Sequence, residues 1–144
     1  MIEHKFSLVI RRPVSEVFVF AIDPEQAPRW RSGIVSARRM SSGAEGVGAT
    51  EVAVRRFLGR RVEIGYVVTE FDRDRRFALR TTSGPAAMIA YTFEPVAEGT
   101  RVHVSGTILA GGLLRLFAPV LAPSLKRDLE GSFGRLKVLL EGAT

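Results

Sequence analysis

Residues 118–141 read APVLAPSLKRDLEGSFGRLKVLLE, and this stretch decides the fold that the sequence predicts. Its large apolar residues recur every three or four positions, which is the period of one face of an α-helix. These residues are Leu121, Leu125, Leu129, Phe133, Leu136 and Leu140. Pro123 suits the first turn of such a helix, where the N–H that proline lacks is not needed. A helix from Pro123 to Leu140 is roughly 27 Å long, so its apolar face needs a partner elsewhere in the chain.

The chain before this helix predicts an antiparallel sheet. Ile2 to Arg12 alternates between apolar and polar residues, as a half-buried strand does. Pro13 ends that strand and opens a short helix, and Asp23-Pro24 opens a second short helix that we expect to end before Pro28. The period then changes to two, and turn residues separate further strands predicted at 34–40, 49–58, 60–71, 77–83, 88–94 and 101–109.

A strand, two short helices, six strands and one long helix, in this order, predict an α+β fold. We expect a curved seven-stranded antiparallel sheet that grips the long C-terminal helix, with the two short helices placed after the first strand. The apolar face of the long helix would then close one side of a pocket. The chain has 144 residues and contains no repeat or long linker, so we expect one domain, residues 1–144.

Several local patterns point to a known family. They are IRRPVSEVF at 10–18, Asp23-Pro24 with Trp30 a few residues on, YVVTEF at 66–71, YTFEP at 91–95 and EGTRV at 98–102. Together with the order of elements, they resemble the START-like helix-grip superfamily (SRPBCC), which includes polyketide cyclases/dehydrases and lipid-transfer domains. The resemblance implies a cavity for hydrophobic ligands between the sheet and the C-terminal helix. It does not choose between enzymes and pure binders, because these motifs are structural.

The expected cavity is lined by the apolar faces of the strands and of the long helix. Two tyrosines on those faces would each place a hydroxyl at the end of an apolar body, where it meets either a core partner or a ligand. Trp30 is expected near the cavity mouth, as a packing residue or a ligand contact. The candidate lining residues are Trp30, Tyr66, Val68, Leu79, Tyr91, Phe93, Val104, Ile108, Leu125, Leu129 and Phe133.

Few residues suit acid–base chemistry. His4 is on the apolar face of the first strand, and His103 is expected to point outward or across to a neighbouring strand. The pattern does not assign Glu51 to either face of its strand, whereas Glu63 is expected to face solvent. Arg55 or Arg80 could hold a ligand carboxylate or enolate if strand phase places it inside; the alternative is a solvated surface position. The catalytic residues therefore stay unknown at this point.

Several classes of site and location are disfavoured. The chain has no cysteine, which excludes disulfides, thiolate metal sites and a cysteine nucleophile. No metal-binding or phosphate-loop motif is present, so we expect neither a metal nor a cofactor. The N-terminus is charged, and no apolar run approaches the ~18 residues that a membrane span requires. We expect a cytoplasmic protein without a transmembrane segment.

Charge and two unusual segments leave alternatives open. The net charge is +6, but the arginine pairs are scattered, so we expect no nucleic-acid binding, although a basic surface favours anionic partners. Gly131 and Gly134 interrupt the long helix, either for close approach of another element or to give space for a ligand or a slight bend. Leu109–Leu121 (LAGGLLRLFAPVL) is a gate over the cavity, a dimer contact, a membrane contact or part of the core.

These features favour the binding of a hydrophobic small molecule, such as a lipid or polyketide, in the cavity under the long helix. One alternative is a polyketide cyclase/dehydrase-type enzyme in which Tyr66 and Tyr91 donate protons. Another is a basic module that binds a macromolecular partner. A homodimer is compatible with all three hypotheses.

Overall fold

The structure is a computed structural model that describes residues 2–43, 45–57, 59–109 and 116–142. Its first half contains β1 (Ile2–Ile10), α1 (Val14–Ile22), the 3-10 helix η1 (Pro24–Gln26), α2 (Ala27–Trp30), β2 (Ile34–Arg39) and β3 (Thr50–Phe57). Its second half contains β4 (Arg60–Asp72), β5 (Arg76–Thr81), β6 (Ala87–Val96), β7 (Gly99–Ile108) and α3 (Ala118–Glu141).

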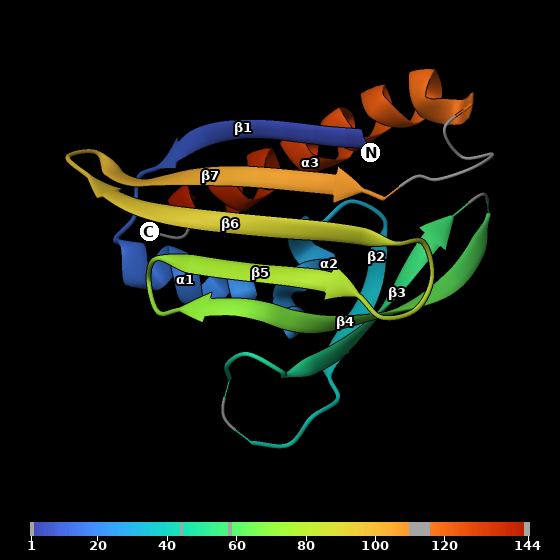
Figure 1. The fold of residues 1–144 in the computed structure, drawn as a ribbon. Helices are drawn as coiled ribbons and strands as arrows, with labels where there is room; N and C mark the ends of the chain where they lie inside the picture. The colour runs from blue at the N-terminus through green and yellow to red at the C-terminus, as the bar shows by residue number, and fades with distance from the viewer. Residues whose placement is uncertain (1, 44, 58, 110–115, 143–144) are drawn as a thin grey trace.

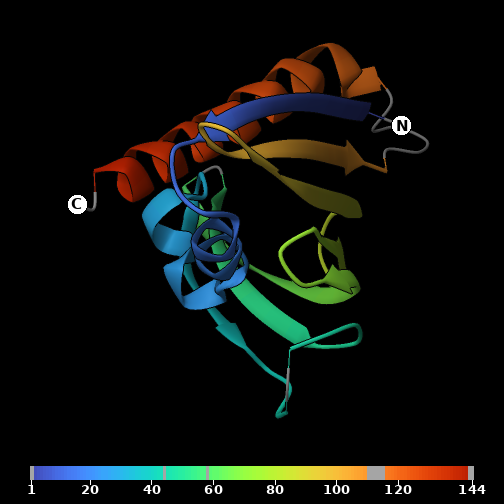
Figure 2. The same cartoon turned by 90° about the vertical axis from the view of Figure 1, so that its left-hand side faces the viewer.

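The seven strands form one antiparallel sheet in the order β1-β7-β6-β5-β4-β3-β2. The sheet bends strongly, and α3 runs beside β1 and β7 at one end of the strand order (Figures 1 and 2). Helices α1 and α2 lie between α3 and the β2–β4 side of the sheet (Figure 2). This arrangement confirms the predicted α+β helix-grip fold.

Two helix boundaries differ from the prediction, and both differences involve proline. Helix α3 begins at Ala118 with Pro119 in its first turn, so Pro123 lies inside the helix. The second short helix does not end before Pro28, because η1 continues into α2 and Pro28 occupies the first turn of α2. A proline in a first helical turn costs no backbone hydrogen bond.

The core centres on Phe133 of α3. Its ring meets Trp30 edge-on at a centroid distance of 5.0 Å, Tyr91 at 5.1 Å and Phe6 at 5.9 Å. Such edge-to-face pairs are favourable beyond the area that they bury. Helix α3 therefore packs against aromatic residues from α2, β6 and β1 at once.

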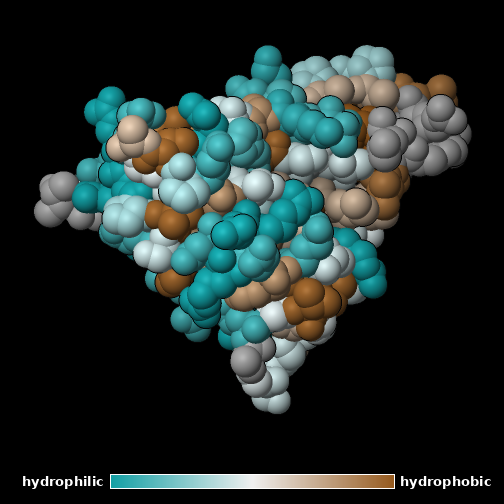
Figure 3. All heavy atoms as spheres, turned by 60° about the vertical axis from the view of Figure 1, so that its left-hand side comes forward, coloured by the Kyte–Doolittle hydropathy of each residue, from teal (hydrophilic) through white to brown (hydrophobic). Residues whose placement is uncertain are grey.

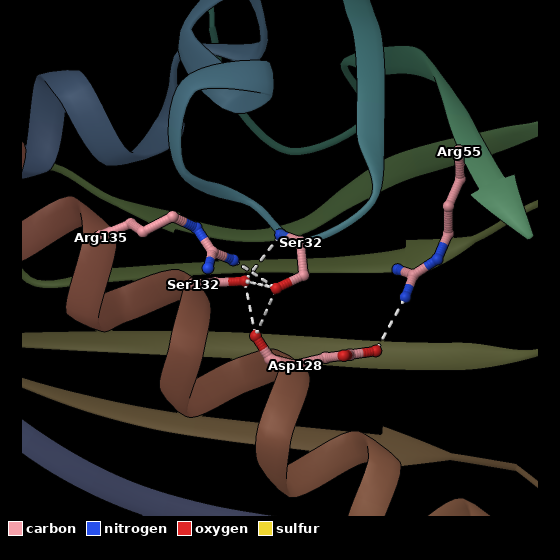
Figure 4. A network of polar contacts seen from close by, with 5 residues as sticks. All are labelled: Ser32, Arg55, Asp128, Ser132 and Arg135. Atoms are coloured by element: carbon pink, nitrogen blue, oxygen red, sulfur yellow. Dashed lines mark hydrogen bonds and ion pairs between the residues drawn. The ribbon is translucent and has the colours of Figure 1, made fainter.

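A polar network fastens α3 to the segment that follows α2 (Figure 4). The Ser32 N–H donates to Ser132 Oγ at 2.8 Å, and the Ser132 hydroxyl donates to the carbonyl of Asp128 at 2.6 Å. Arg135 Nε donates to the carbonyl of Trp30 at 3.0 Å. These bonds hold the middle of α3 at a fixed position relative to Trp30 and Ser32.

A second set of bonds joins α3 to β1. Lys137 Nζ donates to the carbonyl of Val9 at 2.6 Å, and the Arg11 N–H donates to Glu141 Oε2 at 3.0 Å. Because α3 is fixed on both sides, it forms a stable wall over the concave face of the sheet.

The segment Leu109–Leu121 falls partly outside the described residues, which omit 110–115. Its described large apolar side chains, apart from the half-buried Leu121, are exposed to solvent: Leu109, Leu116, Phe117 and Val120. The described part of this segment is therefore not core. In the part of the chain that the structure describes, no helix is long and apolar enough to cross a membrane.

Candidate functional site

The strand register brings the predicted lining residues together on the concave face. Val68 pairs with Leu79 across β4 and β5, and Tyr91 pairs with Val104 across β6 and β7. Ile108 and Leu125 are partly exposed. The other predicted lining residues are buried: Trp30, Tyr66, Val68, Leu79, Tyr91, Phe93, Val104, Leu129 and Phe133.

Close approach of α3 to this face depends on Gly106 in β7. A Cβ atom added at Gly106 would lie 2.5 Å from Leu129 Cδ1 and 3.6 Å from Leu125 Cδ1. Leu125 and Leu129 therefore rest on the sheet itself, as the helical spacing of their stripe predicts.

Within this apolar face lies a polar cluster that we define as Arg31, Glu51, Tyr66 and Tyr91. Glu51 of β3 pairs directly with Tyr66 of β4. Arg31 follows α2, and its guanidinium carbon lies 5.5 Å from the centroid of the Tyr66 ring. Arg31 is also close enough to act electrostatically on Tyr91 and Glu51. The fold thus collects one cation from the segment after α2, one carboxyl from β3, and two phenols from β4 and β6.

Burial governs the electrostatics of the polar cluster. Glu51 is 8% exposed, and burial raises the pKa of its carboxyl, although Arg31 and Arg39 lower it in part. Burial raises the pKa of Tyr91 to about 12, again against the opposing effect of Arg31. Burial lowers the pKa of Arg31, but Tyr91, Tyr66 and Glu51 outweigh this effect and raise it overall. Arg31 therefore stays charged beside a carboxyl that burial drives towards its neutral form.

The indole N–H of Trp30 has no hydrogen-bond acceptor among the described residues, although the side chain is fully buried. The Trp30 ring lies 6.4 Å from that of Tyr91, measured between centroids. A buried donor without an acceptor costs about 1–3 kcal/mol. A bound acceptor at this position would recover that free energy.

The two arginines considered from the sequence have different environments. Arg55 Nη2 lies 3.0 Å from Asp128 Oδ2 of α3, so Arg55 faces inward but is already paired (Figure 4). Arg80 is exposed, as is Glu63. Of these residues, only Arg55 lies against α3, and its role there is to join β3 to the helix.

Neither histidine belongs to the polar cluster. His4 Nε2 lies 2.7 Å from Glu130 Oε2 of α3. His103 is exposed and lies 3.3 Å from Glu94 Oε1 on the neighbouring strand. In the described parts of the chain, no three His, Asp or Glu side chains converge in a way that could hold a metal ion.

Gly131 and Gly134 do not face the sheet. Together with Arg29 of α2 and with Arg135, Val138 and Leu139 of α3, they line a shallow, open hollow of about 440 Å³. Apart from the chain neighbours of Gly134 and the backbone of α3 itself, no described atom lies within 4 Å of a Cβ added at Gly134, so close approach of another element does not explain that glycine. A second hollow of about 320 Å³ lies between α1, η1, the end of β2 and the β4–β5 turn.

Comparison with known proteins gives a family and a fold. The family model described as "Polyketide cyclase / dehydrase and lipid transport" matches residues 1–141. No curated protein matches the chain. Among solved structures, protein TTHA0849 from Thermus thermophilus has a TM-score of 0.79 and 19% identity, with 99% of this chain and 98% of that chain covered.

Two further structures share the architecture. The di-domain ARO/CYC StfQ from the steffimycin biosynthetic pathway has a TM-score of 0.78 and 12% identity, and the match covers 98% of this chain and 51% of StfQ. Protein NE0264 from Nitrosomonas europaea has a TM-score of 0.77 and 15% identity, with 98% and 95% of the two chains covered. At these identities the likeness concerns the fold.

Proposed function

The chain belongs to the polyketide cyclase/dehydrase and lipid transport family, and from that premise we propose that it binds an amphipathic small molecule between the sheet and α3. The observation that carries the proposal is the polar cluster Arg31, Glu51, Tyr66 and Tyr91 within an otherwise apolar concave face. Ligand sites in proteins combine apolar walls with a few orienting polar groups in this way. The predicted lining residues supply the apolar walls.

The polar cluster favours a ligand with an acidic or enolic end. Arg31 supplies a positive charge, and the phenols of Tyr66 and Tyr91 supply hydrogen-bond donors. The Trp30 N–H adds a donor that has no acceptor in the described residues. Charge-assisted bonds of this kind are about twice as strong as neutral ones. The apolar body of the ligand would lie along the strand faces.

Isothermal calorimetry with matched ligands tests this proposal. Long-chain acids and their methyl esters have the same apolar body and differ in the group that would meet Arg31. We expect the acid to bind about 10- to 100-fold more tightly, because a hydrogen bond to a charged group contributes about 1.5–3 kcal/mol. Arg31→Gln should abolish that preference, whereas Arg80→Gln, at an exposed position, should keep it. Equal affinity for acid and ester would contradict the proposal.

A second candidate function is an enzyme of the cyclase/dehydrase type, and Glu51 favours it. Its carboxyl is buried, has a raised pKa and lies beside Arg31 and Tyr66. Such a group can take a proton from the carbon next to a ketone while the electron pair moves to the carbonyl oxygen. Arg31 and a tyrosine would then stabilise the resulting enolate.

Hydrogen–deuterium exchange into a diketone ligand, followed by NMR, tests this chemistry. Wild-type protein should accelerate exchange at the carbon between the two carbonyls, and Glu51→Gln should remove the acceleration while ligand affinity persists. The same acceleration in Glu51→Gln would exclude Glu51 as the base. Binding without any acceleration would leave the protein as a binder.

A further inference from the structure

One end of the molecule exposes large apolar residues on separate elements. At the start of α3, Leu116 is 74% exposed, Phe117 56% and Val120 69%. On the β3–β4 hairpin, Phe57 is 59% exposed, and Leu109 after β7 is 45% exposed. Figure 1 shows that the start of α3, the end of β7 and the β3–β4 hairpin all lie at the right-hand end of the molecule. We call these five residues the apolar tip.

The first turns of α3 project beyond the end of β1. The hydrogen bond between His4 and Glu130 fixes α3 against β1, and α3 runs in the same direction as β1. From Glu130 back to Ala118 the helix rises about 18 Å, whereas β1 continues from His4 to Ile2 for only about 7 Å. The helix therefore extends about 11 Å past the strand, as its orange end does in Figure 1.

Basic residues flank the apolar tip. Arg56 pairs with Arg61 and Phe57 with Arg60 across the β3–β4 hairpin, so three arginines surround Phe57. These three arginines are exposed and have no ion pair among the described residues, whereas Arg55 in the same strand is paired with Asp128. The hairpin thus offers positive charge that no described residue neutralises.

We propose that the apolar tip and the arginines of the β3–β4 hairpin dock on the surface of an anionic lipid bilayer. Phe57, Phe117 and Val120 would enter the interface between headgroups and acyl chains, and Arg56, Arg60 and Arg61 would meet lipid phosphates. Proteins bind bilayer surfaces through this combination of apolar area and basic charge. This surface function is separate from ligand binding under α3 and does not depend on it.

Charge favours a bilayer over a second copy of the chain as the occupant of this end. Two copies that met through it would bring their hairpin arginines together, and like charges repel. An anionic surface instead attracts them, and the net charge of +6 adds to that attraction. On the face that Figure 3 brings forward, by contrast, hydrophobic side chains lie in small patches among hydrophilic ones.

Sedimentation with lipid vesicles tests the proposal. Vesicles of equal parts phosphatidylcholine and phosphatidylglycerol should bind the protein, and vesicles of phosphatidylcholine alone should bind it much more weakly. The double variant Arg60→Ala/Arg61→Ala should weaken binding to the mixed vesicles about 25-fold, since each basic residue near an anionic surface contributes about fivefold. Val120→Asp should weaken it by at least about tenfold, because it places a charge in the apolar contact.

Matched controls lie at the opposite end of the same elements. Val138, like Val120, is an exposed residue of α3, at 72%, so Val138→Asp makes the same change far from the apolar tip. Arg73 and Arg75 are exposed in the β4–β5 turn at the other end of β4, so Arg73→Ala/Arg75→Ala removes the same charge. Both controls should keep wild-type binding within about threefold. Tyr91→Phe should also bind vesicles normally, which separates docking from ligand binding.

Three results would overturn the proposal. Equal losses of vesicle binding in the Arg60/Arg61 and Arg73/Arg75 variants would show that net charge alone attracts the protein and that no particular end of the molecule docks. Absence of vesicle binding, combined with a dimer that Val120→Asp dissociates in sedimentation velocity, would make this end an interface between copies. Absence of both vesicle binding and self-association would remove any docking role. Circular dichroism of each variant confirms that the fold is retained.

Discussion

The titration of Tyr91 tests whether the polar cluster is closed off from water. The chain has two tyrosines, so Tyr66→Phe leaves Tyr91 as the single phenol that can be followed by absorbance. Tyr91 is 2% exposed, and burial raises its pKa to about 12. In the unfolded chain the same phenol should titrate at about 10. We therefore expect the Tyr91 phenol of Tyr66→Phe to titrate with a midpoint of about 12 in the folded protein and of about 10 in the unfolded chain.

The same difference has a consequence for stability. A group whose pKa is higher in the folded state holds its proton more tightly there, so its contribution to stability is complete below the unfolded pKa. That contribution is lost as pH rises from about 10 through the folded pKa of about 12. The full loss corresponds to about 3 kcal/mol. Because the side chain is buried, solvent screening reduces this value little.

A rapid pH jump measures the midpoint before the protein unfolds. Absorbance of the phenolate is read immediately after mixing, and circular dichroism at the same delay confirms that the fold persists. A late step that is absent from Tyr91→Phe belongs to Tyr91. A midpoint near 10 in folded Tyr66→Phe would refute the reasoning, because it would place the Tyr91 hydroxyl in water.

Two further predictions concern a carboxyl and two glycines. Burial raises the pKa of Glu51 in the fold, so the contribution of this carboxyl to stability is complete below its unfolded pKa of about 4.3 and is lost as pH rises through the folded pKa. In urea unfolding, the wild type should therefore lose stability relative to Glu51→Gln over this pH range. Parallel pH profiles of the two proteins would contradict this prediction. Gly134→Ala should stabilise by about 1 kcal/mol, because open space surrounds its Cβ position. Gly99→Ala should destabilise the protein by more than about 1 kcal/mol, because its Cβ would lie 2.4 Å from the carbonyl oxygen of Ile10 and because the φ of this residue is +145°. A shift of the thermal unfolding midpoint in the same direction for both glycine variants would refute this comparison.

The order of the elements could be predicted because each carries a strong local period. The apolar spacing from Leu121 to Leu140 predicts one helix face, and the alternation from Ile2 to Arg12 predicts a strand. The start of α3 could not be fixed in this way. Pro119 and Pro123 both suit a first helical turn, and only the packed structure shows that the helix begins at Ala118.

The apolar part of the candidate site was also predictable, but its charged part was not. In β3 the residues Val52 and Val54 alternate with Glu51 and Ala53, so the sequence pattern assigns Glu51 to neither face of the strand. The structure places Val52 and Val54 on the outer face, partly exposed, and turns Glu51 and Ala53 inward. Arg31 lies near Glu51 because of the course that the chain takes after α2. No local period encodes that path or the register that sets Glu51 beside Tyr66.

The hydrogen bonds that fasten α3 come from residues outside the polar cluster. The helix is fastened by the bonds of Ser132 and Arg135 on one side and of Lys137 on the other. Charged groups taken out of water, fully as Glu51 is or in part as the half-buried Arg31 is, often cost more in desolvation than their attraction restores, and apolar replacements of similar volume are often neutral or stabilising. If Arg31 and Glu51 carry such a cost, the polar end of a bound ligand would offset it.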